Sequence, residues 1–210
     1  MHVNPVILIL TVILIVVFVL MRRKRAAAEG GTKPRKTAAS SAPAPRPPKK
    51  EKPPEEVFMD LRRQAFATPP ETVGMTGQFE PDEPFGAMME MWLSDSVISL
   101  ACFANGDASF VFKSGGGMVG GGVHEPVRKA AQAFVALAQK AWPAMSPATS
   151  DYPLPGQGRV RFYALTPRGI VTAETDREAL GEAGDPLAGL FYGGQEVVAQ
   201  MRQVQEQRAR

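Results

Sequence analysis

The chain has 210 residues, of which 44% are hydrophobic, and a formal net charge of +3. This is enough for one ordinary globular domain with additional segments. Arg22 to Glu55 carries 11 lysines and arginines against 3 acidic residues, whereas the chain from Glu56 onward carries 13 against 18. The positive surplus lies before the domain, which argues against a nucleic-acid-binding fold, because such a fold carries its positive charge on the folded unit.

The chain contains a single cysteine, Cys102, which falls in a predicted strand. No second cysteine is available for a disulfide, and no basic residue or metal-ligand pattern accompanies it. We therefore expect Cys102 to pack as a small hydrophobic residue. Together with His124, the one histidine of the predicted domain, it does not make a ligand set, so the sequence predicts no metal site and no cofactor.

The first strong signal in chain order is an apolar run from Val6 to Met21, in which Thr11 is the only polar residue. As a helix this run spans roughly 24 Å. Asn4, Pro5 and the snorkelling arginines that follow the run can extend it toward the ~30 Å hydrocarbon core. The sequence therefore predicts that residues 1–21 form one transmembrane anchor in the lipid bilayer.

The order of charges around this run distinguishes an anchor from a cleaved signal peptide. A signal peptide has positive charge before the apolar run and small residues at a cleavage site directly after it. Here the basic block from Arg22 to Arg25 follows the run. The positive-inside rule then places the N-terminus outside and the rest of the chain in the cytoplasm. We expect an uncleaved, single-pass membrane protein, whose basic flank can also attract anionic lipid.

Residues 22–55 form a predicted tether between the anchor and the domain. Alanine, proline, lysine, serine and threonine dominate this segment, and it contains no aromatic residue. Such a composition cannot bury a core, so we expect a disordered, basic linker with a reach of roughly 30 Å. A proline-rich linker can also serve as an SH3-type ligand, but a spacer is the simpler interpretation. The soluble domain is predicted for residues 56–204, followed by a polar tail at 205–210.

The domain is predicted to begin with a helix and to continue with three strands. Prolines and acidic residues at 53–56 favour the helix start, and Thr68-Pro69-Pro70 favours its end. Apolar runs then predict strands at 87–92, 97–104 and 107–113. Between the last two strands, Asn105-Gly106 is typical of a two-residue type I′ hairpin. That turn would place Phe103 opposite Ala108, Ala101 opposite Phe110 and Ser99 opposite Phe112.

The second half is predicted to contain a helix at 127–142, a hairpin of strands at 159–166 and 170–175, and a last helix. Thr175 and Glu178 match a capping box that would open a short helix. Asp185 and Pro186 are typical of the start of the last helix, in which Gly193-Gly194 predicts a break. The order α-βββ-α-ββ-α predicts an α+β fold, with an antiparallel sheet of about five strands and helices packed against it.

The motif that most invites a functional interpretation is the glycine-rich stretch between Ser114 and His124. It contains G-x-G-x-x-G, but the preceding strand belongs to an antiparallel hairpin, and no acidic residue ends a strand about twenty residues later. Two interpretations stay open: a turn that permits close backbone packing, and a small-anion or phosphate site formed by backbone N–H groups. The candidate ligand-binding residues are Gly115, Gly116, Gly117, Gly120, Gly121, Gly122 and His124.

His124 could act as a base only with an orienting carboxylate and a nucleophile. Glu125 and Ser114 are the near candidates, but spacing alone does not establish a triad, so we predict no catalytic residue. Arg159 and Arg161 alternate along one face of a predicted strand. They form either a basic strip for an acidic partner or, more simply, a solvated face.

Three stretches carry a resemblance that covers Gly86 to Met201, namely NGDASFVFKSGGGMVGGGVHEPV, YPLPGQGRVRFYALTPRGIVTAE and DPLAGLFYGGQEVVAQMR. The chain resembles a small, uncharacterised bacterial α+β domain family with a G-G-G-x-x-G-x-G-x-H turn and an R-F-x-x-L-T strand. The resemblance implies a bacterial origin and a common fold, and it transfers no activity or site. The element order is also similar to roadblock-type and profilin-like sandwiches, which are interaction modules, and this is an analogy of fold alone.

The layout of anchor, tether and domain predicts a membrane-tethered cytoplasmic binding module. Its expected partner is a protein, a second copy of the chain included, and not a nucleic acid. The alternative is an enzyme that handles a small ligand or phosphate with the Gly115–Gly122 loop and His124. The first hypothesis is favoured because the sequence shows no polar catalytic cluster.

Overall fold

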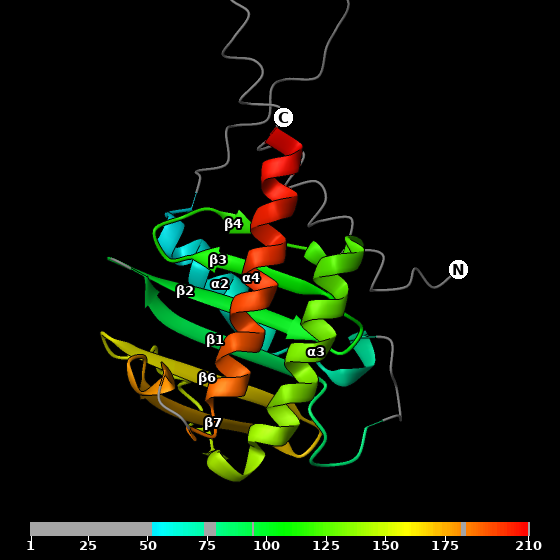
Figure 1. Ribbon diagram of the computed structural model, residues 1–210, viewed down its shortest axis with the longest axis vertical. Coiled ribbons are helices and arrows are strands. Elements are labelled where there is room, and N and C mark those ends of the chain that lie inside the picture. The colour runs from blue at the N-terminus through cyan, green and yellow to red at the C-terminus, as the bar shows by residue number, and fades with distance from the viewer. Residues whose placement is uncertain (1–51, 74–78, 94, 182–183, 210) are drawn as a thin grey trace, which may run out of the picture. The chain divides into compact units, whose positions relative to one another are not determined.

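The computed structural model describes residues 52–73, 79–93, 95–181 and 184–209 (Figure 1). The predicted membrane anchor at 1–21 and nearly all of the predicted tether lie outside these residues, and both stay predictions. A search of the described helices for one with the length and apolar character of a membrane span finds none.

The centre of the fold is an antiparallel sheet in the order β4-β3-β2-β1-β6-β7-β5. Its strands are β1 (Gly86–Leu93), β2 (Ser96–Phe103), β3 (Ala108–Phe112), β4 (Gly117–Met118), β5 (Ser146–Pro147), β6 (Arg159–Thr166) and β7 (Gly169–Asp176). The α+β class is confirmed, but the sheet has seven strands and not about five. The two additional strands, β4 and β5, have two residues each and lie at the edges, where so short a pairing leaves no alternating pattern in the sequence.

Helices cover both faces of the sheet. The α-helices of the described residues are α2 (Pro54–Phe66), α3 (Glu125–Ala141) and α4 (Ala188–Ala209). Short 3-10 turns are η1 (Pro70–Val73), η2 (Gly121–Val123), η3 (Trp142–Ala144) and η4 (Ala179–Gly181). Figure 1 shows α3 and α4 side by side in front of the sheet and α2 behind it. The domain therefore has three layers, with one helix on one side of the sheet and two on the other.

The main core lies between the sheet and the pair α3 and α4. Met89, Leu100 and Phe162 point from three central strands toward Phe134 of α3 and Val197 of α4, and all five are fully buried. Alternate residues of each strand point into this core, and each of the two helices turns its apolar stripe toward it. The largest of the three apolar clusters of the described residues lies on this face.

The predicted break in the last helix is wrong, because α4 continues through Gly193 and Gly194. A Cβ atom added to Gly193 would lie 2.5 Å from Leu137 Cδ1, and one added to Gly194 would lie 2.7 Å from Met89 Sδ. The two glycines therefore let α4 approach both α3 and β1 closely. Local helix propensity predicts a break at two adjacent glycines. Here the two glycines instead permit close packing of a continuous helix.

The predicted register of the first hairpin is wrong by one residue. The Cα partners are Ile98 with Phe112, Ser99 with Val111, Leu100 with Phe110, Ala101 with Ser109, and Cys102 with Ala108. The loop has three residues and not two: Gly106, at φ 87°, donates its N–H to Phe103 O at 2.8 Å. This is a type I turn followed by a left-handed glycine. The slip places Phe110 with Leu100 on the α3–α4 face, and Val111 with Ser99 on the α2 face.

The C-terminal part departs from the prediction at two further points. Thr175 belongs to β7, and only the three-residue η4 follows, so the predicted capping box does not open an α-helix. Asp185 acts as predicted before the last helix, where its Oδ1 accepts the N–H of Leu187 at 2.7 Å. α4 then extends to Ala209, four residues past Gln205, the residue at which a polar tail was predicted.

Candidate functional site

The glycine-rich loop between β3 and α3 is tied closely to the first hairpin. Gly117 has φ 134°, belongs to the edge strand β4, and offers no space for a Cβ atom, which would meet Phe110 O. A Cβ atom on Gly122 would lie 2.6 Å from Gly106 O. At these two positions glycine is needed for backbone packing. Among the other predicted loop ligands, Gly115, Gly116 and Gly120 also have positive φ, and a Cβ atom on Gly121 would lie 3.0 Å from Met201 Cε.

One amide of the loop is used within the chain. The Asp107 carboxylate accepts a hydrogen bond from Ala108 N–H at 2.9 Å, and the backbone amide of Gly122 lies close enough to lower its pKa. Burial raises the pKa of Asp107, and these two backbone donors oppose the rise. The Gly122 amide therefore already has an anionic partner, and an incoming phosphate would compete with Asp107 for it.

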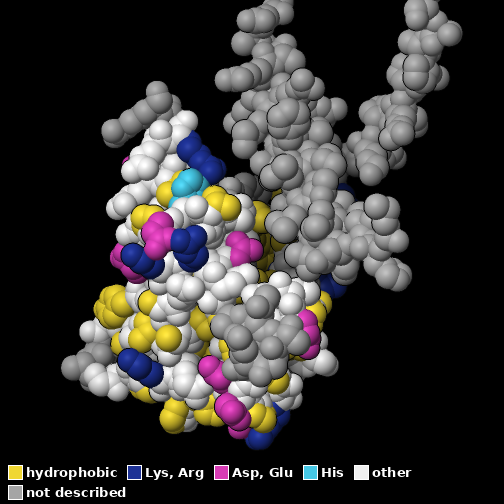
Figure 2. Space-filling view, turned by 90° about the vertical axis from the view of Figure 1, so that its right-hand side faces the viewer, with side chains coloured by type: hydrophobic (Ala, Val, Ile, Leu, Met, Phe, Trp, Pro, Cys, Tyr) yellow, Lys and Arg dark blue, Asp and Glu magenta, His cyan; other side chains and the backbone are white. Residues whose placement is uncertain are grey.

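His124 lies at the start of α3 and at the surface of the molecule, where Figure 2 shows histidine in cyan. Its Nε2 atom is 2.7 Å from an Nη atom of Arg208, near the end of α4. Glu125 forms ion pairs with Arg128 and Lys129, and Ser114 donates its backbone N–H to Ser96 Oγ. Among the described residues, no hydrogen bond joins His124 to Ser114 or Glu125, so these candidates do not form a set of base, orienter and nucleophile.

Cys102 is completely buried in β2 on the α3–α4 face. Burial raises the pKa of its thiol, and the nearby Asp107 carboxylate adds to the rise. It packs as the small hydrophobic residue that the sequence predicts. Within the described segments, no three histidine, cysteine, aspartate or glutamate side chains come together in a way that could hold a metal ion.

A buried ion pair between α2 and β1 was missed by sequence reasoning. Arg62 Nε donates to Glu90 Oε1 at 2.7 Å and Arg62 Nη2 donates to Glu90 Oε2 at 2.9 Å. Ser99 Oγ donates to Glu90 Oε1 at 2.9 Å. Glu90 is 0% exposed and Arg62 is 5% exposed. Burial raises the pKa of Glu90, and the hydrogen bonds from Arg62 and Ser99 oppose this effect. The available signal was one glutamate inside the otherwise apolar strand GAMMEMWL.

The segment between β5 and β6 closes over this ion pair. Tyr152 has φ 41° and is the only non-glycine residue with a positive φ among the described residues. Its carbonyl oxygen accepts a hydrogen bond from Arg62, and its ring stacks on Phe66 with centroids 4.2 Å apart. Tyr163 meets Phe66 edge-on at 4.8 Å and donates its hydroxyl to Pro153 O at 2.7 Å. The unfavourable backbone conformation of Tyr152 is thus held by contacts with α2.

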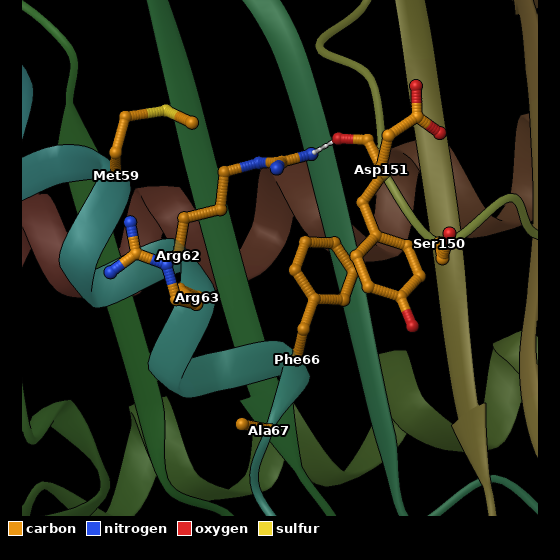
Figure 3. A pocket seen from close by; sticks show the side chains of 8 residues that line it. Met59, Arg62, Arg63, Phe66, Ala67, Ser150 and Asp151 are labelled. Atoms are coloured by element: carbon orange, nitrogen blue, oxygen red, sulfur yellow. Dashed lines mark hydrogen bonds between the residues drawn. The ribbon is translucent and has the colours of Figure 1, made fainter.

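An open pocket of about 430 Å³ lies between α2 and this segment (Figure 3). Its lining residues are Met59, Arg62, Arg63, Phe66, Ala67, Ser150, Asp151 and Tyr152. The Phe66 and Tyr152 rings form an apolar wall beside the Arg62 hydrogen bond to the Tyr152 carbonyl (Figure 3). The Arg63 side chain is 73% exposed and donates to Asp60 Oδ1 at 2.9 Å. The pocket therefore combines aromatic surface with an accessible cation.

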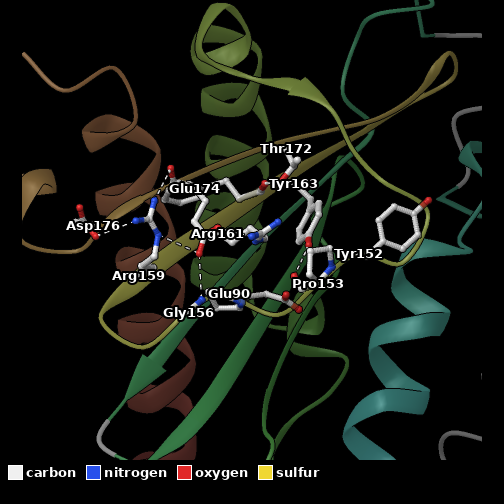
Figure 4. A network of polar contacts seen from close by, with 12 residues as sticks. Glu90, Tyr152, Pro153, Gly156, Arg159, Arg161, Tyr163, Thr172, Glu174 and Asp176 are labelled. Carbon is white, nitrogen blue, oxygen red and sulfur yellow. Dashed lines mark hydrogen bonds and ion pairs between the residues drawn. The ribbon is translucent and has the colours of Figure 1, made fainter.

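The predicted basic strip on β6 is neutralised by acidic residues of β7 (Figure 4). Arg161 pairs with Glu174, and Arg159 Nε lies 3.2 Å from Glu174 Oε1. Arg159 also reaches Asp176 Oδ1 at 3.2 Å. Opposite charges directly across two antiparallel strands stabilise the pairing. These arginines are therefore engaged within the sheet and do not form an uncompensated basic surface.

A comparison of the chain with protein-family models, with curated proteins and with solved structures finds no match. The resemblance to a small bacterial domain family and the analogy with interaction modules stay predictions.

Proposed function

We propose that this protein is a membrane-tethered binding module that works through contacts with a protein partner. On this proposal, residues 1–21 anchor it in a bacterial inner membrane, and the tether holds the domain on the cytoplasmic side. The charge order around Val6 to Met21 supports the anchor and its orientation.

The observation that carries the proposal is the pocket beside α2. Methionine, arginine, phenylalanine and tyrosine, which line it through Met59, Arg63, Phe66 and Tyr152, are the residue types enriched at protein–protein interfaces. Aromatic and arginine side chains also carry much of the binding energy at such surfaces. α2 is the first helix of the described domain and directly follows the predicted tether in the chain. The pocket therefore lies beside the element that the tether would enter.

The test is recovery of a partner with the tagged full-length chain from detergent-solubilised membranes. We expect one protein, or a second copy of the chain, to be enriched in a constant ratio. Replacing the exposed pocket residue, Arg63→Ala, should lower that recovery about tenfold, as for an interface arginine worth roughly 1.4 kcal/mol. The matched control is Lys129→Ala, because Lys129 is 74% exposed on α3. Failure to enrich any protein, the chain itself included, would refute the proposal.

The alternative is a small-ligand or phosphate-handling enzyme that uses the Gly115–Gly122 loop and His124. Two observations weigh against it: the Gly122 amide already faces the Asp107 carboxylate, and His124 contacts Arg208 at the surface. Thermal-shift measurements with nucleotides and inorganic phosphate test it directly. A shift that is lost in His124→Ala, but kept in Lys129→Ala, would favour the enzyme.

A further inference from the structure

α2 docks on the sheet through one stripe of side chains that lie four residues apart. Phe58, Arg62 and Phe66 succeed one another along the helix, so they share one face. Phe58 and Arg62 are almost fully buried, and Phe66 is half-buried. Residues 54–57 at the start of the helix are exposed. α2 therefore contacts the domain mainly through a phenylalanine–arginine–phenylalanine stripe.

The surface that receives α2 matches each part of this stripe. Phe58 packs in a cluster with Val97 of β2 and Val111 of β3. Arg62 meets both carboxylate oxygens of Glu90, and Phe66 stacks on Tyr152. The receiving residues come from three strands and from the segment between β5 and β6, and none is a chain neighbour of α2. They form a groove with an acidic centre and an apolar or aromatic residue at each end.

The buried carboxylate makes this groove selective. An occupant without an arginine at the central position would leave Glu90 buried without a cation, which is strongly unfavourable. Lysine cannot reproduce the two parallel hydrogen bonds that the guanidinium makes. The ion pair itself adds little net stability, because the desolvation of both charges offsets their attraction. Docking of α2 is therefore specific to its sequence and depends for its strength on the two phenylalanines.

The described residues on either side of α2 make no backbone hydrogen bond with a strand of the sheet. In 67–73 and 79–80, the parts of this connection that the structure describes, the backbone hydrogen bonds are local, and Val73 makes the buried apolar contact. Further along the chain, Pro81 O accepts the N–H of Arg168 in the β6–β7 turn at 2.9 Å, and Phe85 donates its N–H to Leu165 O of β6 at 2.9 Å. α2 can therefore leave the groove without opening any strand pair.

We propose that α2 is exchanged between two copies of this chain, so that the α2 of each copy occupies the groove of the other. The occupant whose residues fit the groove is α2 itself, and exchange of an identical element keeps every contact while joining two copies. The inference rests on the proposed function, because anchoring in one membrane raises the effective concentration of copies for each other. It identifies the partner of the module as a second copy.

The wild-type chain allows a direct test at the Lys113–Glu55 contact. Lys113 Nζ of the loop after β3 lies 2.9 Å from Glu55 Oε1 of α2, so a carbodiimide can join the two as an amide. An equal mixture of isotope-labelled and unlabelled full-length chain is reconstituted in vesicles of phosphatidylethanolamine and phosphatidylglycerol, cross-linked, and digested for mass spectrometry. We expect cross-links between a labelled and an unlabelled peptide, in a proportion that approaches random pairing as incubation lengthens.

The internal control is the Lys129–Glu125 contact at 3.4 Å, which lies within one turn of α3. Cross-links at this contact must join two labelled or two unlabelled peptides, because both residues belong to the same helix. Only collisions between copies would join a labelled peptide to an unlabelled one. If the Lys113–Glu55 cross-links also stay within one label at all times, the exchange is refuted. Recovery of a different protein in the pull-down would then still support the proposed function, so the two failures are distinguishable.

Charge reversal gives a second test. Arg62→Glu and Glu90→Arg each place like charges at the buried position, so each variant alone should lose α2 docking by about a hundredfold. When the two variants are mixed, exchange puts the α2 of each variant into the groove of the other, and both grooves then contain opposite charges. We therefore expect a heterodimer that neither variant forms alone. The double variant in one chain, Arg62→Glu with Glu90→Arg, restores the pair within a copy and shows that the reversed pair is tolerated. A folded double variant together with a mixture that forms no heterodimer would refute the exchange.

Discussion

The two faces of the sheet are built in different ways. The face toward α3 and α4 is apolar across its centre, and glycines at 193 and 194 bring the layers close. The face toward α2 buries a complete ion pair, Arg62 with Glu90, beneath a segment with one unfavourable backbone conformation at Tyr152. Apolar packing supplies most of the stability of a domain, whereas buried polar groups can select one arrangement among several. The first face thus holds the fold together, and the second determines what may dock there.

The largest effect is expected from truncation on the apolar face. Phe134 is fully buried between the sheet and α4, so Phe134→Ala should lower the free energy of unfolding by about 4 kcal/mol. Denaturant unfolding measures this change. The matched variant Phe66→Ala, on the half-buried stripe of α2, should cost clearly less. Equal losses at the two positions would remove the distinction between the faces.

The ion pair gives the sharpest contrast. Arg62→Ala leaves Glu90 buried without its cation and should cost about 3 kcal/mol. Replacing both partners, Arg62→Met with Glu90→Leu, should be neutral or stabilising, because both desolvation costs disappear. A double variant that is as unstable as Arg62→Ala would show that the pair itself stabilises the fold. The corresponding double-variant cycle is measured by denaturant unfolding.

The close approach of α4 to α3 should tolerate less change than its exposed turns. Gly193→Val places a branched side chain against Leu137 and should cost about 2 kcal/mol by overpacking. Gly189→Val, at an exposed position of α4 with nothing within 4 Å of a Cβ atom, is the control and should be far milder. Thermal unfolding of both variants provides the comparison.

The smallest effect is expected at Tyr163 on the α2 face. Burial raises the pKa of its hydroxyl to about 12, from an ordinary value of 10.0. The unfolded chain therefore releases this proton first, so the free energy of unfolding should fall as pH rises from about 10 to 12, and be unaffected by this group below that range. Tyr163→Phe should reduce this alkaline loss and cost about 1 kcal/mol at neutral pH, because the hydrogen bond to Pro153 is removed. An unchanged alkaline profile in the variant would contradict the assignment.

Much of the fold follows from local patterns in the sequence. The five longer strands and three helices are visible because alternation and helical spacing persist over many residues. β4 and β5 are too short for such a pattern. The hairpin register was missed because Asn105-Gly106 suits a two-residue turn, whereas here Asn105 Oδ1 accepts the N–H of Asp107 and stabilises a three-residue turn. One residue of error in the register then placed Phe110 on the same face as Ala101 instead of Leu100.

The candidate site was less predictable because its parts are distant in the sequence. Glu90 stands out in its strand, but nothing in local spacing connects it with Arg62 or with the carbonyl of Tyr152. The glycine-rich loop attracted attention because its composition is unusual. At Gly117 and Gly122 the structure explains that composition by backbone contacts. Long-range polar pairs of this kind become visible only when the packing of α2 is known.

The position of α2 at the start of the folded domain has a mechanical consequence. A pull along the chain from the N-terminal side enters the domain at Lys52 and Pro54 and loads α2 before any strand. The contacts of Glu55, Phe58, Arg62 and Phe66 follow one another along the helix, so they would be loaded one after another. The strands, joined to each other by ladders of hydrogen bonds, bear load only afterwards. α2 is therefore the element through which tension on the chain would first be felt.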